Sequence, residues 1–393
     1  MPKKSAPRKR TKKTVKKKDG GLASRIKKAG AKLSEPIWGG PAVEGITQSM
    51  INGYLCCRER FRIRSIEGLR PIERFSPALA YGNFWHKCEE YMDGDWETKL
   101  RTEAMKEISK YPLEQDQVEK WWNVCKVQFK IYLKHYAAEH RKQKLELTEV
   151  KFQVPYKLPS GRTAILRGMW DGVIRQGKKY RLKENKTKGK IDETMVERLL
   201  DFDIQTMLYT TMLRHAARNG LYGLKNIPVD GVMYNVIRKP LSGGIGSIRP
   251  LQAKSRKGVI HTPAETMPQY YARLGTIIEN EENLDHFFMR WNVEVSQKDI
   301  DLYEQTFLQP ILENILDDYE WWSYCLEHVW NHFDYSVRAE KFPEHQNRHY
   351  RHPFGTFNWL NEGGGSGYDE YLKTGMKTDL HVDPSMFPEL EEE

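Results

Sequence analysis

The chain has 393 residues, of which 39% are hydrophobic, so it is long enough for one large domain or two smaller ones with a substantial core. No apolar run approaches the length of a membrane span and the N-terminus has no signal-peptide core, so we expect neither a membrane protein nor a secreted one. Five cysteines without paired spacing are typical of a reducing compartment.

The formal net charge of +10 is concentrated at the N-terminus. Residues 1–35 contain 14 basic and 2 acidic residues, whereas the remainder has 49 basic and 51 acidic ones. Because few apolar side chains accompany these charges, we expect residues 1–36 to form a disordered basic tail. Such a tail can attract DNA by neutralising phosphates, and it resembles a nuclear-import signal; a solvated tail without a dedicated role fits equally well.

The first candidate site residue is His86, which we expect on a short helix opened by Gly82. A lone histidine is more often structural than a metal ligand, so it gains weight only from other motifs. Residues 97–146 are predicted to be a helical insertion, and residues 147–157 a strand that leads into a sheet.

A β-hairpin is predicted next. Residues 162–176 are rich in β-formers, residues 179–186 resume the pattern, and Gly177-Lys178 suits a two-residue loop. In that register paired residue numbers sum to 355, so Asp171 faces Glu184, with Lys186 on the same face as Glu184. Two facing carboxylates repel each other unless a divalent cation lies between them. An exposed hairpin with ordinary surface charges is the alternative.

The hairpin is followed by a predicted helix from about residue 192 to 219, ended by Gly220. Gln205 and Tyr209 are four residues apart and therefore project from one face of it. They could contact a nucleic-acid backbone near the metal or lie at the edge of the core. A further strand is predicted over 228–238.

The stretch 239–261 is rich in glycine and in basic residues, so it suits either gripping a nucleic-acid strand or a mobile surface loop. Thr262 and Glu265 form a capping box with proline at the first helical position, which predicts that a helix begins there. Long helices are expected to about His332, and an irregular extension over residues 341–393.

Four short patterns occur in order: Gly82 to His86, Gly168 to Asp171, Glu184 to Lys186, and Gln205 to Tyr209. This ordered set resembles the PD-(D/E)XK nucleases, specifically the RecB-like exonuclease branch, which includes nuclease domains of bacterial recombination helicases, CRISPR spacer-acquisition nucleases and many phage exonucleases. The resemblance covers about residues 45–240, and the rest of the chain matches more loosely.

The resemblance implies an α/β fold, with a central mixed β-sheet of the restriction-endonuclease-like type flanked by helices and a helical C-terminal region. We expect a nuclease domain over residues 37–340, interrupted by the helical insertion. It also implies that His86, Asp171 and Glu184 hold Mg²⁺ or Mn²⁺, with the carbonyl of Asn185 as a further ligand.

In the same pattern Lys186 orients or helps to deprotonate the attacking water, and Gln205 and Tyr209 position the DNA. The implied function is a metal-dependent DNA exonuclease acting in recombination, repair or phage replication. It would work in the cytoplasm of a bacterium or a phage-infected cell, with DNA and a recombination or replication protein as partners.

Many relatives carry an iron–sulfur cluster whose first ligand falls at Cys57 or its neighbour Cys56. Their other three ligands are late cysteines, but no cysteine follows Cys325 here, so we expect no four-cysteine cluster. A zinc site is the less favoured alternative to packing and surface roles for a late group of residues: Cys325, His328, His332, His345, His349 and His352.

Three other functions remain open from the sequence. One is a structure-specific or sequence-specific endonuclease, which shares the chemistry. A second is a non-catalytic DNA-binding protein that retains the fold, although intact Asp171, Glu184 and Lys186 argue against it. The third is a structural phage or chromatin-associated protein that merely carries a basic tail.

Overall fold

The computed structural model describes residues 38–56, 58–66, 69–71, 75–189, 203–240, 249–256, 259–328 and 380–382. Four parts of the sequence-based predictions lie outside these residues: the tail, Cys57, the first half of the helix predicted from residue 192, and the late histidines His332, His345, His349 and His352. Cys325 and His328 are described only as part of a helix backbone.

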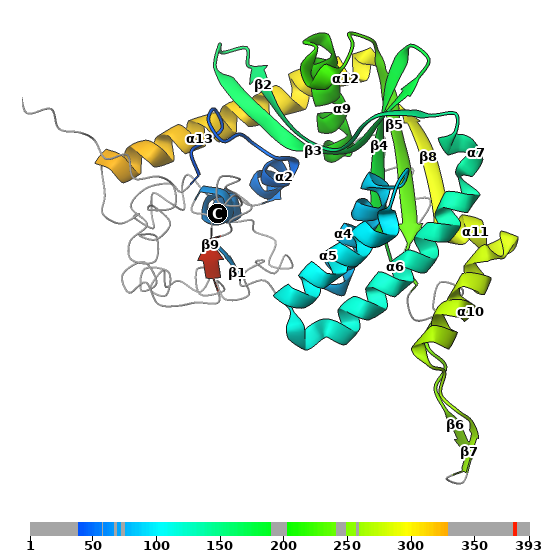
Figure 1. The fold of residues 1–393 in the computed structure, drawn as a ribbon. Helices are drawn as coiled ribbons and strands as arrows, with labels where there is room; N and C mark the ends of the chain where they lie inside the picture. Colours follow the sequence, from blue (N-terminus) through cyan, green and yellow to red (C-terminus); the bar gives the residue numbers. More distant parts are fainter. Residues whose placement is uncertain are drawn as a thin grey trace, which may run out of the picture.

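A five-stranded mixed sheet in the order β2-β3-β4-β5-β8 forms the centre of the molecule (Figure 1). Its strands are β2 Lys144–Lys157, β3 Thr163–Gln176, β4 Lys179–Lys188, β5 Val229–Arg238 and β8 Phe288–Glu294. The β4–β5 pair is parallel and the other three pairs are antiparallel. This confirms the predicted mixed α/β fold.

The β3–β4 hairpin has the predicted two-residue turn. Gln176 pairs with Lys179 and Gly172 pairs with Lys183, so paired numbers sum to 355 as predicted. The ladder ends there, one step before Asp171 and Glu184, which corrects the prediction that these two residues form a backbone pair. Beyond this point β4 continues along β5, where Lys186 pairs with Val236, and Ile46 bridges to Leu166 of β3.

The helices between residues 77 and 140 cover one face of the sheet together with the helices between β5 and β8 (Figure 1). They are α4 Pro77–Glu90, α5 Trp96–Lys110, η2 Pro112–Glu114, α6 Gln115–His135, α7 Ala137–His140, α10 Met267–Glu279 and α11 Glu281–Phe287. Their core is aromatic, with Trp85 packed edge-on against Phe129 and Tyr132. The tryptophans of the predicted insertion, Trp121 and Trp122, pack against this core.

The helix that carries His86 is longer than predicted. α4 begins at Pro77, and Ser76 caps it by accepting a hydrogen bond from the Leu79 amide. Gly82 therefore lies inside α4 and does not open it. A Cβ at Gly82 would lie 3.5 Å from Thr187 Oγ1 of β4, an ordinary van der Waals contact, so the packing of the helix on the strand does not require glycine here.

The opposite face of the sheet is covered by the remaining described helices (Figure 1). They are α2 Gln48–Cys56, α3 Arg58–Phe61, η1 Arg62–Ile66, α9 Ile204–Arg218, η3 Leu221–Gly223, α12 Gln297–Tyr303, η4 Glu304–Leu308 and α13 Gln309–His328. Side chains from β4 and β5, including Leu182 and Val232, pack with Leu208 and Met212 of α9 in the larger core. Among the described helices, none is both long enough and apolar enough to cross a bilayer.

The region after β5 differs from the sequence-based expectation in three places. Thr262 ends strand β7, and α10 begins five residues later with Thr266 and Gln269 as its capping box. The prediction of long helices to about His332 is also wrong in part, because β8 forms an edge strand at Phe288–Glu294. A short strand, β9 Leu380–Val382, lies in the segment predicted to be irregular and pairs with β1 Leu69–Pro71.

A small two-stranded sheet lies between β5 and α10. β6 Lys254–Arg256 and β7 Val259–Thr262 pair in antiparallel fashion. In Figure 1 this hairpin stands away from the rest of the ribbon, at the end of the sheet opposite the β3–β4 turn.

Candidate active site

The predicted site residues gather where the β3–β4 ladder ends. Asp171 of β3 is 7% exposed, and its Oδ2 accepts a hydrogen bond from the backbone N–H of Asn185 over 2.8 Å. This bond occupies the step at which the ladder would otherwise continue. Asp171 Oδ1 lies 3.6 Å from Nδ1 of His86, a residue of α4.

A third acidic residue of the site, Glu149 of β2, joins this group. Its Oε1 lies 3.0 Å from His86 Nδ1, and ligand atoms of His86, Glu149 and Asp171 all lie within 4.8 Å of one another. Glu149 has a φ of 50°, a backbone conformation that is uncommon outside glycine and is found more often at functional sites. Nothing in the sequence singles Glu149 out. Only the β2–β3 register, which pairs Thr148 with Gly172 and Val150 with Trp170, places it opposite Asp171.

Glu184, Lys186 and Gln205 form the other half of the site. Glu184 Oε1 lies 2.5 Å from Lys186 Nζ and accepts a hydrogen bond of 2.7 Å from Gln205 Nε2. Lys186 Nζ in turn donates to Gln205 Oε1 over 2.8 Å. Gln205 is held near the first turn of α9, which Asp203 caps by accepting from the Thr206 amide. The amide predicted to position DNA therefore binds the acidic and basic residues of the site.

Tyr209 lies on the same side of α9 and packs beside the site. Its ring meets Phe152 edge-on at 5.3 Å between centroids, and its carbonyl accepts from Trp170 Nε1. A Cβ at Gly168 would lie 2.8 Å from Phe152 Cζ and 3.0 Å from Tyr209 Cε1. The glycine that opens the Gly168–Asp171 motif is therefore needed for close packing of β3 against α9.

The buried site carries strongly perturbed charges. Burial, followed by the negative charge of Asp171, raises the pKa of Glu184 to about 7, and burial also raises the pKa of Asp171. Burial alone would lower the pKa of His86, but the hydrogen bond to Glu149 and the charge of Asp171 raise it to about 9. The carboxylates therefore favour a cation between them, and a proton on His86 partly fills that role here.

The donor set fits a divalent metal ion. Glu184 Oε2 is buried and has no hydrogen-bond partner among the described residues, which leaves a carboxylate oxygen free to be a ligand. His86, Glu149 and Asp171 could supply further ligand atoms. Carboxylate oxygens suit Mg²⁺, and an imidazole nitrogen makes the site acceptable to Mn²⁺ as well.

A buried polar network supports the site from behind β4. Lys183 and Asn185 point away from Glu184, and Lys183 forms a buried ion pair with Glu89 of α4. The Asn235 amide of β5 donates to Asn185 Oδ1 over 3.0 Å and also contacts Tyr132 Oη over 2.5 Å. The network joins α4, α6, β4 and β5, and it fixes the backbone of Asn185, whose N–H holds Asp171.

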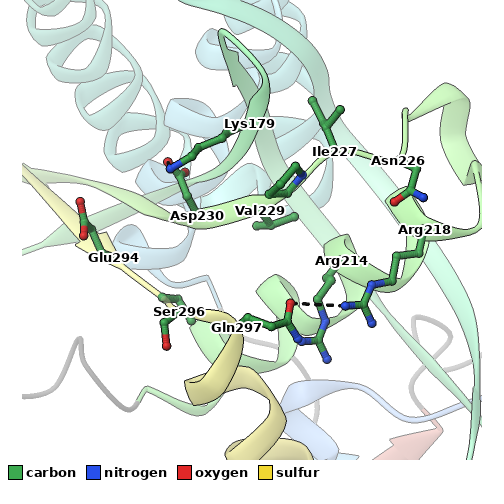
Figure 2. Close-up of a pocket in the computed structure, with 12 residues that line it drawn as sticks. Lys179, Arg214, Arg218, Asn226, Ile227, Val229, Asp230, Glu294, Ser296 and Gln297 are labelled. Atoms are coloured by element: carbon green, nitrogen blue, oxygen red, sulfur yellow. Dashed lines mark hydrogen bonds and ion pairs between the residues drawn. The ribbon is translucent and has the colours of Figure 1, made fainter.

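A cavity of about 570 Å³ lies at the opposite end of the sheet (Figure 2). Lys179 and Asp230 line it from the starts of β4 and β5, and Arg218 donates a hydrogen bond to Gln297 beside it. None of the site residues predicted from the sequence lines this cavity. This cavity is therefore separate from the candidate active site.

Comparison with known proteins agrees with this geometry. A family model described as the PD-(D/E)XK nuclease superfamily matches residues 46–333, which include every residue of the site. No curated protein matches the chain in sequence.

Proposed function

The chain belongs to the PD-(D/E)XK nuclease superfamily, and we propose that it is a metal-dependent DNA exonuclease of the RecB-like branch. Nucleases of this superfamily hydrolyse phosphodiester bonds and use divalent metals to do so. The observation that carries the proposal is the meeting of Asp171, Glu184 and Lys186 with His86 where β3 and β4 part.

We assign the metal ligands to the acidic half of the site. His86, Asp171 and Glu184 would hold Mg²⁺ or Mn²⁺, and Glu149 would either join them or hold His86 in position. When bound, the metal ion lowers the pKa of a water molecule and stabilises negative charge on the phosphate. The Asn185 carbonyl is a further candidate ligand, and its position depends on the hydrogen bonds of its amide and side chain.

Lys186 supplies the positive charge. Burial alone would lower the pKa of its ammonium group, but the adjacent Glu184 raises that pKa above the usual value. Lys186 is therefore a cation at neutral pH, and it orients water or a phosphate oxygen by donating hydrogen bonds. Gln205 holds Lys186 and Glu184 together, so we assign Gln205 the role of positioning these two side chains; Tyr209 supports the helix that carries it.

The finer assignment to the RecB-like branch is supported by the four ordered motifs and by the way α4 and α9 deliver His86 and Gln205 to the site. We propose a role in recombination, repair or phage replication on the same ground. We also propose that no four-cysteine iron–sulfur cluster is present, because the sequence has no cysteine after Cys325.

Digestion of DNA tests the proposal directly. The protein is incubated with end-labelled linear duplex, end-labelled single-stranded DNA and covalently closed circular DNA in Mg²⁺, in Mn²⁺ and in EDTA. We expect degradation of linear DNA only, and only with a divalent cation. Cleavage of closed circles would instead identify an endonuclease, and metal-independent or absent cleavage would overturn the nuclease assignment for this chain.

A further inference from the structure

The β6–β7 hairpin and its flanks carry basic residues and no acidic ones. From Lys239 to Ala264 the sequence contains five lysines and arginines and no acidic residue, whereas the chain after residue 35 is nearly neutral. Lys254 is exposed, and so are the apolar side chains of Leu251 and Ile260, at 56% and 64%. Exposed apolar groups among positive charges on a projecting hairpin are complementary to a partner that is both anionic and partly apolar.

The chain leaves β5 near the candidate active site before it reaches the hairpin. Lys186 pairs with Val236, and the chain departs from β5 at Lys239, whose N–H donates to the carbonyl of Lys188 over 2.7 Å. The point where the chain leaves β5 thus lies three residues from the partner of Lys186. In Figure 1 β6 and β7 extend outward from the start of α10.

The base of the hairpin is fixed by a charged clamp. Glu265 accepts hydrogen bonds of 2.8 Å from Nε and from Nη2 of Arg273, and it accepts another from the Leu251 amide. The Glu265 amide donates back to the carbonyl of Leu251, and Arg273 also donates to the carbonyl of Arg249. Both sides of the hairpin are therefore tied to α10, so the hairpin is held in one direction relative to the site.

We propose that the β6–β7 hairpin binds duplex DNA by entering its major groove, and that it holds the duplex next to the active site. The proposal rests on the nuclease function proposed above. The major groove is wide enough for a two-stranded β-ribbon. The two strands have three and four residues and therefore reach about 10 to 13 Å, which is close to three or four base pairs. The basic side chains would meet phosphates, and Leu251 and Ile260 would contact thymine methyl groups or sugars.

The test compares two variants with the same change in charge. The arm variant is Lys254→Glu, Arg256→Glu and Lys257→Glu. The control variant is Lys178→Glu, Lys225→Glu and Lys298→Glu, three exposed lysines near the start of β4. The Lys225 N–H donates to Tyr180 Oη of β4, and the neighbours Lys179 and Gln297 of the other two line the same cavity. Affinity for a blunt duplex is measured in EDTA at several salt concentrations, and hydrolysis of the same duplex is measured with Mg²⁺.

In the arm variant we expect duplex affinity to fall about tenfold or more. The slope of log affinity against log salt concentration should become shallower by about 2 to 3. We expect KM for the duplex to rise while kcat is retained, because the site itself is unchanged. The control variant should keep most of the affinity. Equal losses in both variants, or duplex affinity unchanged in the arm variant, would overturn the proposal. Binding in EDTA does not require hydrolysis, so the two proposals can fail separately. If only the nuclease assignment is wrong, duplex binding will still be weakened in the arm variant, but no duplex will be cleaved with Mg²⁺.

Discussion

Glu149 Oε1 and His86 Nδ1 lie 3.0 Å apart and join the edge strand β2 to helix α4 across the candidate active site. Because this contact also fixes the ring that faces Asp171, Glu149 should matter whether it binds the metal or only orients His86. We expect Glu149→Gln to weaken Mn²⁺ binding about 10- to 100-fold, the usual effect of losing a group that supports a metal ligand. Calorimetric titration measures this. Glu146→Gln, in the same strand but paired with Lys144 and Arg175, is the control and should bind as the wild type does.

Asp171→Ala and Lys186→Ala should each abolish Mg²⁺-dependent DNA degradation while leaving the protein folded. Asp171→Ala removes a carboxylate from the metal site, and Lys186→Ala removes the cation beside Glu184. Lys178→Ala, in the exposed turn of the same hairpin, is the matched control and should remain active. Time courses on end-labelled duplex, with circular dichroism to verify folding, make the comparison. Full activity in either site variant would refute its assigned role.

Glu184→Gln should stabilise the metal-free protein at high pH. The pKa of Glu184 is raised from 4.5 to about 7, so the folded state holds its proton to higher pH than the unfolded state does. The free energy of unfolding of the wild type therefore falls as pH rises from about 4.5 to about 7 and stays lower above that. The glutamine variant lacks this loss, and its advantage should reach the order of 3 kcal/mol at about pH 8.

Urea unfolding in EDTA at about pH 5 and about pH 8 measures that difference. Saturating Mg²⁺ should stabilise the wild type more than the variant, because the cation removes the repulsion between Glu184 and Asp171. An advantage of the variant that is the same at both pH values would show that the ionisation of Glu184 is not its cause.

Gly168→Ala should destabilise the fold by about 1 to 3 kcal/mol, because the new methyl group would overlap Phe152 and Tyr209. The matched control is Gly53→Ala in α2, where a Cβ meets no atom within 4 Å. That change should be stabilising by about 0.5 to 1 kcal/mol, as expected for alanine in place of glycine inside a helix. Thermal unfolding of both variants tests the contrast, and equal effects would contradict the packing role of Gly168.

Lys183→Met should destabilise the fold by about 3 to 5 kcal/mol, since it leaves the buried carboxylate of Glu89 without its partner. Adding Glu89→Leu should restore much of the loss, because the double variant buries no unpaired charge. Both variants are compared by urea unfolding and by DNA degradation. If the double variant recovers stability but not activity, the ion pair is needed to place α4, and hence His86, relative to β4. A double variant less stable than Lys183→Met would contradict the pairing.

The β3–β4 hairpin could be predicted because a two-residue turn fixes the register of every residue pair that follows it. Where the ladder ends could not be predicted, since α4 and α9 pack against the sheet from opposite faces at that point and deliver His86 and Gln205. Glu149 was missed for a related reason: its position depends on the β2–β3 register, and no short motif marks it.

Other errors have local causes. Thr262 and Thr266 both begin plausible capping boxes, and the pairing of β6 with β7 takes up Thr262, so only Thr266 is free to start the helix. Strand β8 contains Arg290, Asn292 and Glu294, and its charges hide the pattern of a strand that pairs with β5. In both places strand pairing, which the short motifs do not reveal, determined the secondary structure.

Strand β2 has a consequence for self-association, because within the described residues β3 is its sole partner in the sheet. Pro155 of β2 faces Ile165, whose own N–H and C=O bond to Pro41 and Ile46 on the far side of β3. This is a pair without mutual hydrogen bonds, so the main chain of Pro155 faces the outer edge. Proline has no N–H to offer there, and exposed Lys151 and Lys157 flank it. The edge is thereby made a poor template for the strand of a second molecule, which opposes aggregation through the open side of the sheet.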